Sequence, residues 1–183
     1  TGTSGFVGSA IARRLAADGH DIRVLVRPTS DRRNLEGLSV EIVEGDLAQP
    51  ETLEPAVVGC DAVFHVAADY RIWVPDDGAS MYRVNVDGTR DLIRAASDGG
   101  VRRLVYTSSV AVLYPLPGIG VADETAAATV DDMISHYKKS KFLAEEEVMR
   151  LVREESAPVV IVNPAAPFGP RDIKPTPTGR IVL

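Results

Sequence analysis

The stretch Thr1-Gly2-Thr3-Ser4-Gly5-Phe6-Val7-Gly8 opens the chain as a glycine-rich run that leads directly into an amphipathic helix. In such a run Gly2 permits a tight turn, Gly5 lets a ligand approach the backbone, and Gly8 lets the helix pack closely on a sheet. The free N–H groups and the positive end of the dipole at a helix N-terminus favour an anion. The spacing therefore predicts a loop that cradles the pyrophosphate of a dinucleotide, although glycine runs of this kind also occur in ordinary turns.

The composition is that of one soluble globular domain. The chain has 183 residues, of which 45% are hydrophobic and 25% charged. Its net charge of -6, with scattered basic residues, argues against binding to nucleic acid. The single cysteine, Cys60, excludes an internal disulfide and suits a reducing, cytoplasmic location. The longest uncharged run, residues 104–122, is interrupted by prolines and glycines, so we expect no membrane span.

Strand-like and helix-like segments alternate along the chain. The expected strands are residues 22–26, 40–43, 62–68, 104–107 and 159–162, and the expected helices are residues 6–18, 51–58, 81–97 and 131–155. This alternation predicts an α/β fold, a Rossmann-type doubly wound parallel sheet. The apolar run 62–68 is typical of a parallel strand buried on both faces. A Pro- and Gly-rich loop is expected at residues 115–120.

The strand that should feed the glycine run is not in the sequence. In a dinucleotide-binding sheet that strand lies in the middle, so we expect a slot with two unpaired strand edges. The sequence starts inside a motif and stops in an apolar element, residues 181–183. We therefore expect a fragment at both ends, with the first strand and the C-terminal substrate lobe missing.

Tyr137 and Lys141 form the most specific chemical pattern. They lie four residues apart on an expected helix and therefore share a face. A neighbouring ammonium favours the phenolate, so Tyr137 would be able to exchange a proton with a substrate hydroxyl or carbonyl. Residues 106–109 place hydroxyls at the carboxyl end of a strand, where open α/β sheets bind ligands. The alternatives are a surface tyrosine beside a solvated lysine and serines that cap a turn, but the order after the glycine run favours catalysis.

Several short motifs together resemble the extended short-chain dehydrogenase/reductase family, also called the NAD-dependent epimerase/dehydratase family. The motifs are Thr1-Gly2-x-x-Gly5-x-x-Gly8, Asp46-Leu47, Val66-Ala67-Ala68, Asn85-Val86-x-Gly88-Thr89, Ser109, Tyr137-x-x-x-Lys141 and Asn163-Pro164. Within that family, residues 67–73 and 169–180 are similar to the hopanoid-associated sugar epimerases, which in turn resemble dihydroflavonol 4-reductases. The resemblance covers nearly the whole sequence.

The resemblance implies a role for each matched residue. Tyr137 would be the catalytic acid/base, Lys141 would lower its pKa and bind the nicotinamide ribose, and Ser109 would position the substrate oxygen. At the pyrophosphate, the cofactor would be held by Gly2, Gly5 and the N–H groups of Phe6 and Val7. Asp46 and Leu47 would contact the adenine, and Ala67 and Ala68 would contact the middle of the dinucleotide. Pro164 would lie near the nicotinamide carboxamide. Residues 1–170 would form the NAD(P)-binding domain, and residues 171–183 would begin the substrate-binding part.

Arg27 bears on the choice of cofactor. An acidic residue at the end of the second strand of this fold accepts from the ribose 2′-OH of NAD, whereas an arginine suits a 2′-phosphate. This sequence has Arg27 there, and Thr29, Ser30 and Arg32 would add donors. Charge pairing therefore favours NADP, with NAD still possible. The alternative interpretation is a solvated arginine at a strand end.

These residues predict an NAD(P)-dependent oxidoreductase that moves hydride at a carbinol or carbonyl carbon of a small-molecule substrate. An epimerase of a nucleotide sugar or hopanoid-linked sugar would return the hydride to the other face, whereas a dihydroflavonol 4-reductase-like enzyme would consume NADPH. The family resemblance favours the first and Arg27 the second. A non-catalytic dinucleotide-sensing module is a further alternative, against which the Tyr137/Lys141 pair counts.

Other features are less specific. The expected helices 81–97 and 131–155 are candidates for a homodimer interface, because such helices form dimers in relatives. The histidines share no metal-ligand spacing, so we expect no metal site. Tyr70 and Trp73, after a cofactor-binding strand, are candidates for substrate contact. Asp131 and Asp132 are expected to cap the helix that follows them.

Overall fold

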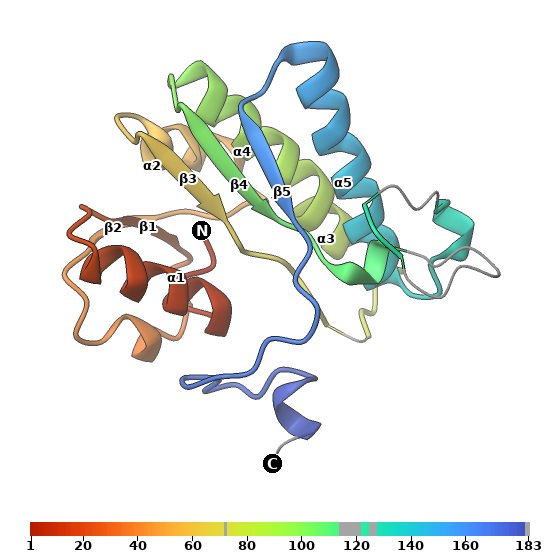
Figure 1. Ribbon diagram of the computed structural model, residues 1–183, viewed down its shortest axis with the longest axis horizontal. Helices are drawn as coiled ribbons and strands as arrows, with labels where there is room; N and C mark the ends of the chain where they lie inside the picture. The colour runs from red at the N-terminus through yellow and green to blue at the C-terminus, as the bar shows by residue number, and fades with distance from the viewer. Residues whose placement is uncertain (72, 114–121, 125–127, 182–183) are drawn as a thin grey trace.

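The computed structural model describes residues 1–71, 73–113, 122–124 and 128–181 (Figure 1). Among these residues the strands are β1 (Arg23–Val26), β2 (Glu41–Glu44), β3 (Ala62–His65), β4 (Arg103–Thr107) and β5 (Val159–Val162). The α-helices are α1 (Phe6–Ala17), α2 (Glu54–Val57), α3 (Ala79–Tyr82), α4 (Gly88–Asp98) and α5 (His136–Glu155). The predicted alternation of strands and helices is confirmed. The loop expected at 115–120 lies outside the described residues.

The strands form two separate parallel sheets. One sheet pairs β1 with β2, and the other has the order β3-β4-β5, with Val63 opposite Leu104 and Tyr106 opposite Ile161. Among the described strands β1 and β3 are not paired with each other, as expected from the sequence. The backbone nitrogen of Thr1 donates to the carbonyl of Phe64 over 2.7 Å. The glycine run therefore begins at the edge of β3, between the two sheets (Figure 1).

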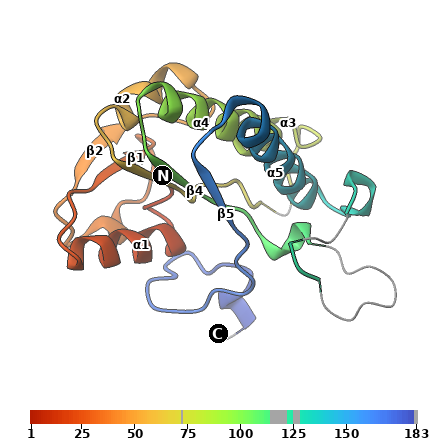
Figure 2. The ribbon, with the colours of Figure 1, turned by 45° about the horizontal axis from the view of Figure 1, so that its top comes forward.

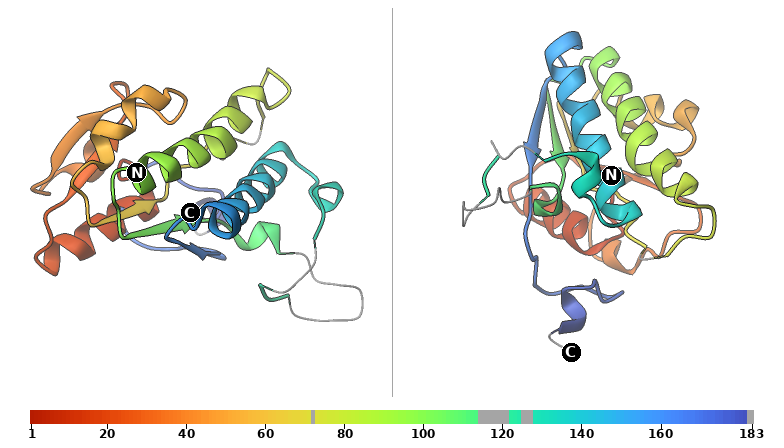
Figure 3. Two further views of the ribbon diagram at one scale, coloured as in Figure 1. Left: turned by 90° about the horizontal axis from the view of Figure 1, so that it is seen from above. Right: turned by 90° about the vertical axis from the view of Figure 1, so that its right-hand side faces the viewer.

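Helices lie on both faces of the strands, which is the arrangement of a doubly wound sheet. Figure 2 shows α2, α4 and α5 above the strands and α1 below them, and Figure 3 shows α4 and α5 side by side along one face. The largest apolar cluster fills the space under α4 and α5. Its fully buried members include Leu53, Leu92, Ile93, Leu104, Tyr106, Val148 and Leu151.

The strand expected at residues 62–68 is shorter and less covered than predicted. It ends at His65, because the N–H of Ala67 turns toward the Thr1 hydroxyl, 3.3 Å away, instead of continuing the sheet. Val63 and His65 are buried, whereas Ala62 is exposed. The prediction of burial on both faces is therefore wrong for this strand.

The helix expected at residues 131–155 begins later, at His136, and the side that it buries is only partly the expected one. Its N-cap is Ser135, whose hydroxyl accepts from the N–H of Lys138, while Asp132 caps a short 3₁₀ turn with Thr129. The sequence predicts an apolar side formed by Ile134, Phe142, Leu143, Val148, Leu151 and Val152. Of these, Ile134, Leu143 and Val152 are exposed. Val148 and Leu151 are buried as expected, and Ser140, Lys141 and Ala144 are buried beside them. The sequence did not predict that a serine and a lysine would face the sheet.

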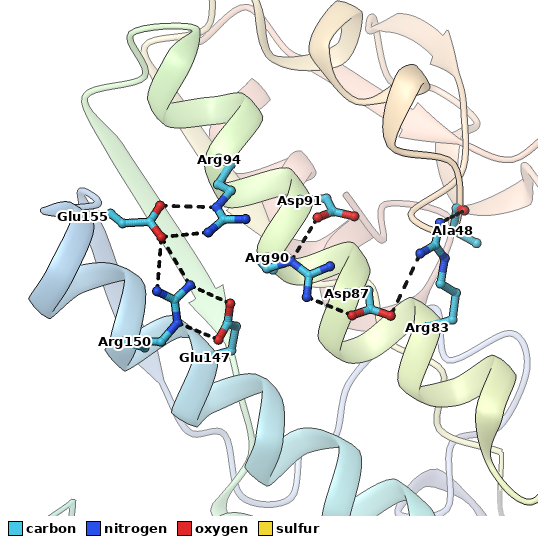
Figure 4. A network of polar contacts seen from close by, with 9 residues as sticks. All are labelled: Ala48, Arg83, Asp87, Arg90, Asp91, Arg94, Glu147, Arg150 and Glu155. Atoms are coloured by element: carbon cyan, nitrogen blue, oxygen red, sulfur yellow. Dashed lines mark hydrogen bonds and ion pairs between the residues drawn. The ribbon is translucent and has the colours of Figure 1, made fainter.

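Ion pairs join α4 to α5 on the outer surface of the molecule (Figure 4). Arg94 of α4 bonds Glu155 of α5 over 2.8 Å, and Arg150 bonds both Glu155 and Glu147. Each such pair contributes little to stability in water, but a shared network fixes side-chain geometry. The two helices therefore present an ordered, charged outer face.

Candidate active site

The glycine loop lies directly against the end of β3. Gly2 has a φ of +78°, and a Cβ atom at this position would lie 2.7 Å from the nitrogen of Ala67. A Cβ at Gly8 would lie 2.3 Å from the carbonyl oxygen of Gly2. Gly8 is therefore required by the loop itself, which corrects the expectation that it serves packing on a sheet.

Gly5 differs from the other two glycines because a Cβ there would make one tight contact but would not overlap another atom. It is exposed, it forms the N-cap of α1, and the nearest atom to a Cβ there is the Gly2 oxygen at 3.2 Å. Phe6 and Val7 are the first two residues of α1, so no carbonyl of the helix reaches their amides. This open cradle at the N-terminus of a twelve-residue helix fits a diphosphate.

A buried chain of hydrogen bonds runs from the loop into the protein. The Thr89 hydroxyl donates to the carbonyl of Asn85 over 2.6 Å, so it must accept from Nε2 of His65, 2.8 Å away. His65 Nδ1 then accepts from the Thr1 hydroxyl over 2.9 Å. Burial lowers the pKa of His65 well below its ordinary value, which agrees with a neutral ring. His65 is a satisfied core histidine that holds the glycine loop.

Asn85 extends this chain to the helix that carries Tyr137. Its side chain accepts from the N–H of Asp69 and donates to the Asp69 carbonyl, which closes a two-bond clamp on the loop after β3. It also donates to the Ser140 hydroxyl over 2.9 Å, and Ser140 donates to the carbonyl of Tyr137 over 2.8 Å. Asn85 lies in a π-helical turn, Arg83–Asp87, between α3 and α4, and such turns are frequent at functional sites.

Lys141 reaches from α5 to the end of β4. Its side chain is buried, and Nζ donates to the Tyr106 hydroxyl and to the Thr107 carbonyl, both over 2.9 Å. The ammonium also lies 4.4 Å from the centre of the Tyr106 ring. Burial lowers the pKa of Lys141 to about 7, and the charge of Glu145 acts in the opposite direction.

Tyr137 is half-buried and lies one turn before Lys141. Burial raises the pKa of the Tyr137 phenol, and a hydrogen bond with Ser109 acts to lower it. This direction is opposite to the expected one, because the Lys141 ammonium is directed to Tyr106 and Thr107 instead of the phenol. The hydrogen-bond partner of the Tyr137 phenol is therefore Ser109, while Lys141 bonds two residues of β4.

Ser109 is held at the end of β4 by the neighbouring strand. The backbone on either side of it, at Ser108 and Val110, donates to carbonyls of Val162 and Pro164. The Ser109 hydroxyl accepts from the N–H of Ala111 over 3.1 Å and caps a short 3₁₀ turn. Pro164 is thus a backbone partner of this segment, while its expected place beside a carboxamide stays a prediction.

The expected adenine and ribose residues lie at the ends of β1 and β2. Arg27, Pro28 and Thr29 are exposed, whereas Arg32 pairs with Glu44 over 2.5 Å. The carboxylate of Asp46 accepts from the N–H of Ala48 over 3.0 Å. The Leu47 side chain is buried in the core, so contact of Asp46 and Leu47 with adenine stays a prediction.

Ala67 and Ala68 are half-buried and follow β3 beside Gly2, where the dinucleotide was expected to pass. Beyond them, Tyr70 and Trp73 are exposed.

No cluster of three potential metal ligands occurs in the part of the chain that the structure describes. None of its described helices is long and apolar enough to cross a membrane.

Sequence reasoning missed four polar residues that hold this site together: Asn85, Ser140, Glu145 and Asn163. Asn85 and Asn163 stood in the motifs that carried the family resemblance, yet no role had been assigned to either. Ser140 and Glu145 lie one residue before and four residues after Lys141, and no role had been assigned to them either. The spacing of four residues between Lys141 and Glu145 on one helix is a signal that would have pointed to Glu145.

Comparison with known proteins agrees with this geometry. The chain is 45% identical over 183 residues to a Synechocystis sp. protein named "Putative dihydroflavonol 4-reductase", covering 52% of that protein. It matches the crystal structure of gox2253 with a TM-score of 0.92 and 54% identity, over 100% of this chain and 55% of that one. Thermus thermophilus UDP-glucose 4-epimerase in complex with NAD gives a TM-score of 0.85 at 26% identity, over 99% of this chain and 58% of that one.

The chain thus spans just over half of the length of these relatives. The family model of the NAD dependent epimerase/dehydratase family matches residues 1–183, the whole of this sequence. The chain belongs to the NAD-dependent epimerase/dehydratase family.

Proposed function

We propose that the protein carrying this chain is an NAD(P)H-dependent carbonyl reductase. The observation that carries the proposal is the meeting of Tyr137, Ser109 and the buried Lys141 at the end of β4, on a chain that begins with an open phosphate cradle. A bound NAD(P)H would supply the hydride to the carbonyl carbon. Tyr137 would give its phenolic proton to the carbonyl oxygen, which yields an alcohol and the oxidised cofactor.

The state of Tyr137 suits this direction of reaction. Its raised pKa keeps the phenol protonated at neutral pH, as a proton donor to a developing alkoxide requires. Ser109 would donate to the same oxygen. The likeness to a protein named as a dihydroflavonol 4-reductase, at 45% identity, supports a ketone as the substrate class.

We propose NADP as the preferred cofactor. Arg27 directly follows β1 and is exposed, so its guanidinium would suit a 2′-phosphate. Arg32 is paired with Glu44 and is a weaker candidate for this contact. The site for a substrate would be completed by the segment that begins near residue 171.

A sugar epimerase is the second candidate, favoured by the TM-score of 0.85 with a UDP-glucose 4-epimerase. An epimerase would use the same Tyr137 to remove and return one proton, and it would retain its cofactor through the cycle.

We also propose a homodimer through α4 and α5, supported by Leu143 and Val152, which are exposed on α5. Light scattering of the wild type and of Leu143→Asp tests this interface.

The experiment that separates reductase from epimerase measures the cofactor. The full-length protein is purified, and any cofactor released by denaturation is identified with its redox state. A reductase is expected to bind NADPH reversibly and to oxidise it when a dihydroflavonol or an aryl ketone is added. Tightly held NAD that survives purification, with conversion of a UDP-sugar and no net NADPH oxidation, would reject the reductase in favour of the epimerase.

A further inference from the structure

Glu145 and Asn163 form a polar pair beside the candidate catalytic residues. Glu145 lies four residues after Lys141 on α5, so the two side chains share a face of the helix. Asn163, just after β5, donates from Nδ2 to Oε2 of Glu145 over 2.9 Å. The same Nδ2 donates to the backbone carbonyl of Ser109 over 3.2 Å. One amide therefore ties the Glu145 carboxylate to the residue whose hydroxyl bonds Tyr137.

Glu145 differs in charge from the other titratable groups around Lys141. Tyr106 faces it from β4, His65 from β3, and Tyr137 from its own helix. The pKa of both phenols is raised by burial, and the pKa of His65 is lowered by burial, so all three groups are neutral at pH 7. Glu145 is the one carboxylate that raises the pKa of Lys141 among the described residues.

A buried ammonium needs such a charge. Both hydrogen-bond acceptors of Lys141, the Tyr106 hydroxyl and the Thr107 carbonyl, are uncharged. Desolvation disfavours the charged form of a lysine at such a position, and a carboxylate on the next turn opposes this effect. The Glu145 carboxylate is itself fixed by Asn163 instead of rotating into solvent.

We propose that Glu145, held by Asn163, is a positioning residue that keeps Lys141 charged and couples that charge to the Ser109 end of β4. This role rests on the proposed function, because a charged Lys141 matters only to a site that uses Tyr137 and a dinucleotide. Glu145 acts through Lys141 and Ser109 and would not touch the substrate.

The test reads the ionisation of Lys141 directly. Full-length protein labelled with ¹³C at the lysine Cε is titrated by NMR, and the Lys141 signal is assigned from its loss in Lys141→Met. Glu145→Gln keeps the shape and the acceptor for Asn163 but removes the charge. We expect it to lower the titration midpoint of Lys141 by about 1 pH unit. Glu145→Asp should restore part of the shift.

Glu146→Gln is the matched control, because Glu146 is the adjacent carboxylate and is exposed. It should leave the midpoint of Lys141 where it is in the wild type. If Glu145→Gln does not fold, Asn163→Ala, which releases Glu145, must lower the midpoint instead. An unchanged midpoint in the folded variant overturns the proposal. The titration needs no substrate, so it stands apart from the NADPH oxidation that tests the reductase.

Discussion

Asn85 donates to the hydroxyl of Ser140 over 2.9 Å, and this bond joins the π-helical turn before α4 to the helix that carries Tyr137. The two residues are 55 positions apart in the chain, and both are buried. Through Ser140 the contact ends on the backbone of Tyr137, and through Asp69 it fixes the loop beside Ala67 and Ala68. Asn85 thus connects the expected cofactor side of the site to its expected catalytic side.

Replacing Asn85 by alanine should destabilise the protein strongly. The change leaves the N–H and carbonyl of Asp69 without their side-chain partner and removes one partner of Ser140. Buried polar groups left in this way cost about 1–3 kcal/mol each, so we expect a loss of roughly 2–4 kcal/mol in the free energy of unfolding. Urea denaturation measures it, with the exposed Ser97→Ala on α4 as the control. A loss no larger than that of Ser97→Ala would refute the clamp.

His65 should make stability depend on pH in the acidic range. Its pKa is lowered in the folded protein, so below about pH 6.5 the unfolded chain binds a proton that the native state does not. Stability therefore falls as the pH drops below that value, by up to about 1.4 kcal/mol per pH unit for this group. His65→Gln should reduce this slope between pH 6.5 and 5. The exposed His20→Gln should not alter it, and equal slopes in His65→Gln and the wild type would contradict the buried neutral ring.

The glycines of the loop should separate stability from ligand binding. Gly8→Ala places a Cβ 2.3 Å from the Gly2 oxygen, so it should lower both the melting temperature and the affinity for NADPH. At Gly5 a Cβ would meet no atom nearer than 3.2 Å, and the residue has an ordinary φ of -89°. Gly5→Ala should lower the melting temperature much less than Gly8→Ala, because the Gly2 oxygen would have to move by only a few tenths of an ångström, and it should weaken NADPH binding by about tenfold or more. Thermal shift measures the melting temperature, and fluorescence titration measures the affinity for NADPH. An unaltered affinity in Gly5→Ala would contradict the proposal that this loop binds the phosphates of the cofactor.

Arg27 should set the choice between the two nicotinamide cofactors. Loss of a charge-assisted contact to a 2′-phosphate costs about 1.5–3 kcal/mol, which corresponds to a weakening of roughly tenfold to a hundredfold. Arg27→Gln should therefore weaken NADPH binding by that factor and leave NADH binding nearly unchanged. Arg32→Gln is the comparison, because Arg32 is paired with Glu44. A parallel loss of both cofactors in Arg27→Gln would exclude recognition of the 2′-phosphate by this side chain.

The sequence predicted the order of strands and helices because hydrophobic runs and glycine stops are local signals. The helix expected at 6–18 ends at Ala17, just before Gly19, and the strands at 22–26, 104–107 and 159–162 lie within a residue of their expected bounds. The rotation of α5 was not predictable in this way. Lys141 faces inward because its partners are Tyr106 and Thr107, which lie 35 and 34 residues away. A helical period read from Leu143 and Val152 cannot include such contacts.

In the candidate site, too, the residue types and spacings could be predicted from the sequence, whereas the tertiary contacts could not. Tyr137, Lys141, Ser109 and the glycine run were recognised by type and spacing, and the structure brings the first three to one end of β4. The partners that orient them, Asn85 and Asn163, make contacts 55 and 54 residues away, respectively. Their roles follow from tertiary packing, as does the raised pKa of Tyr137.

The most direct measurement is the rate of hydride transfer in Tyr137→Phe of the full-length protein. NADPH oxidation is first established for the wild type against a dihydroflavonol or an aryl ketone, and the variant is then compared under single-turnover conditions. Removing the phenolic proton donor should slow the transfer by about 10²–10⁴-fold, while the Kd for NADPH stays within about threefold. A transfer rate equal to that of the wild type, with cofactor binding intact, would contradict the assignment of Tyr137 as the catalytic acid.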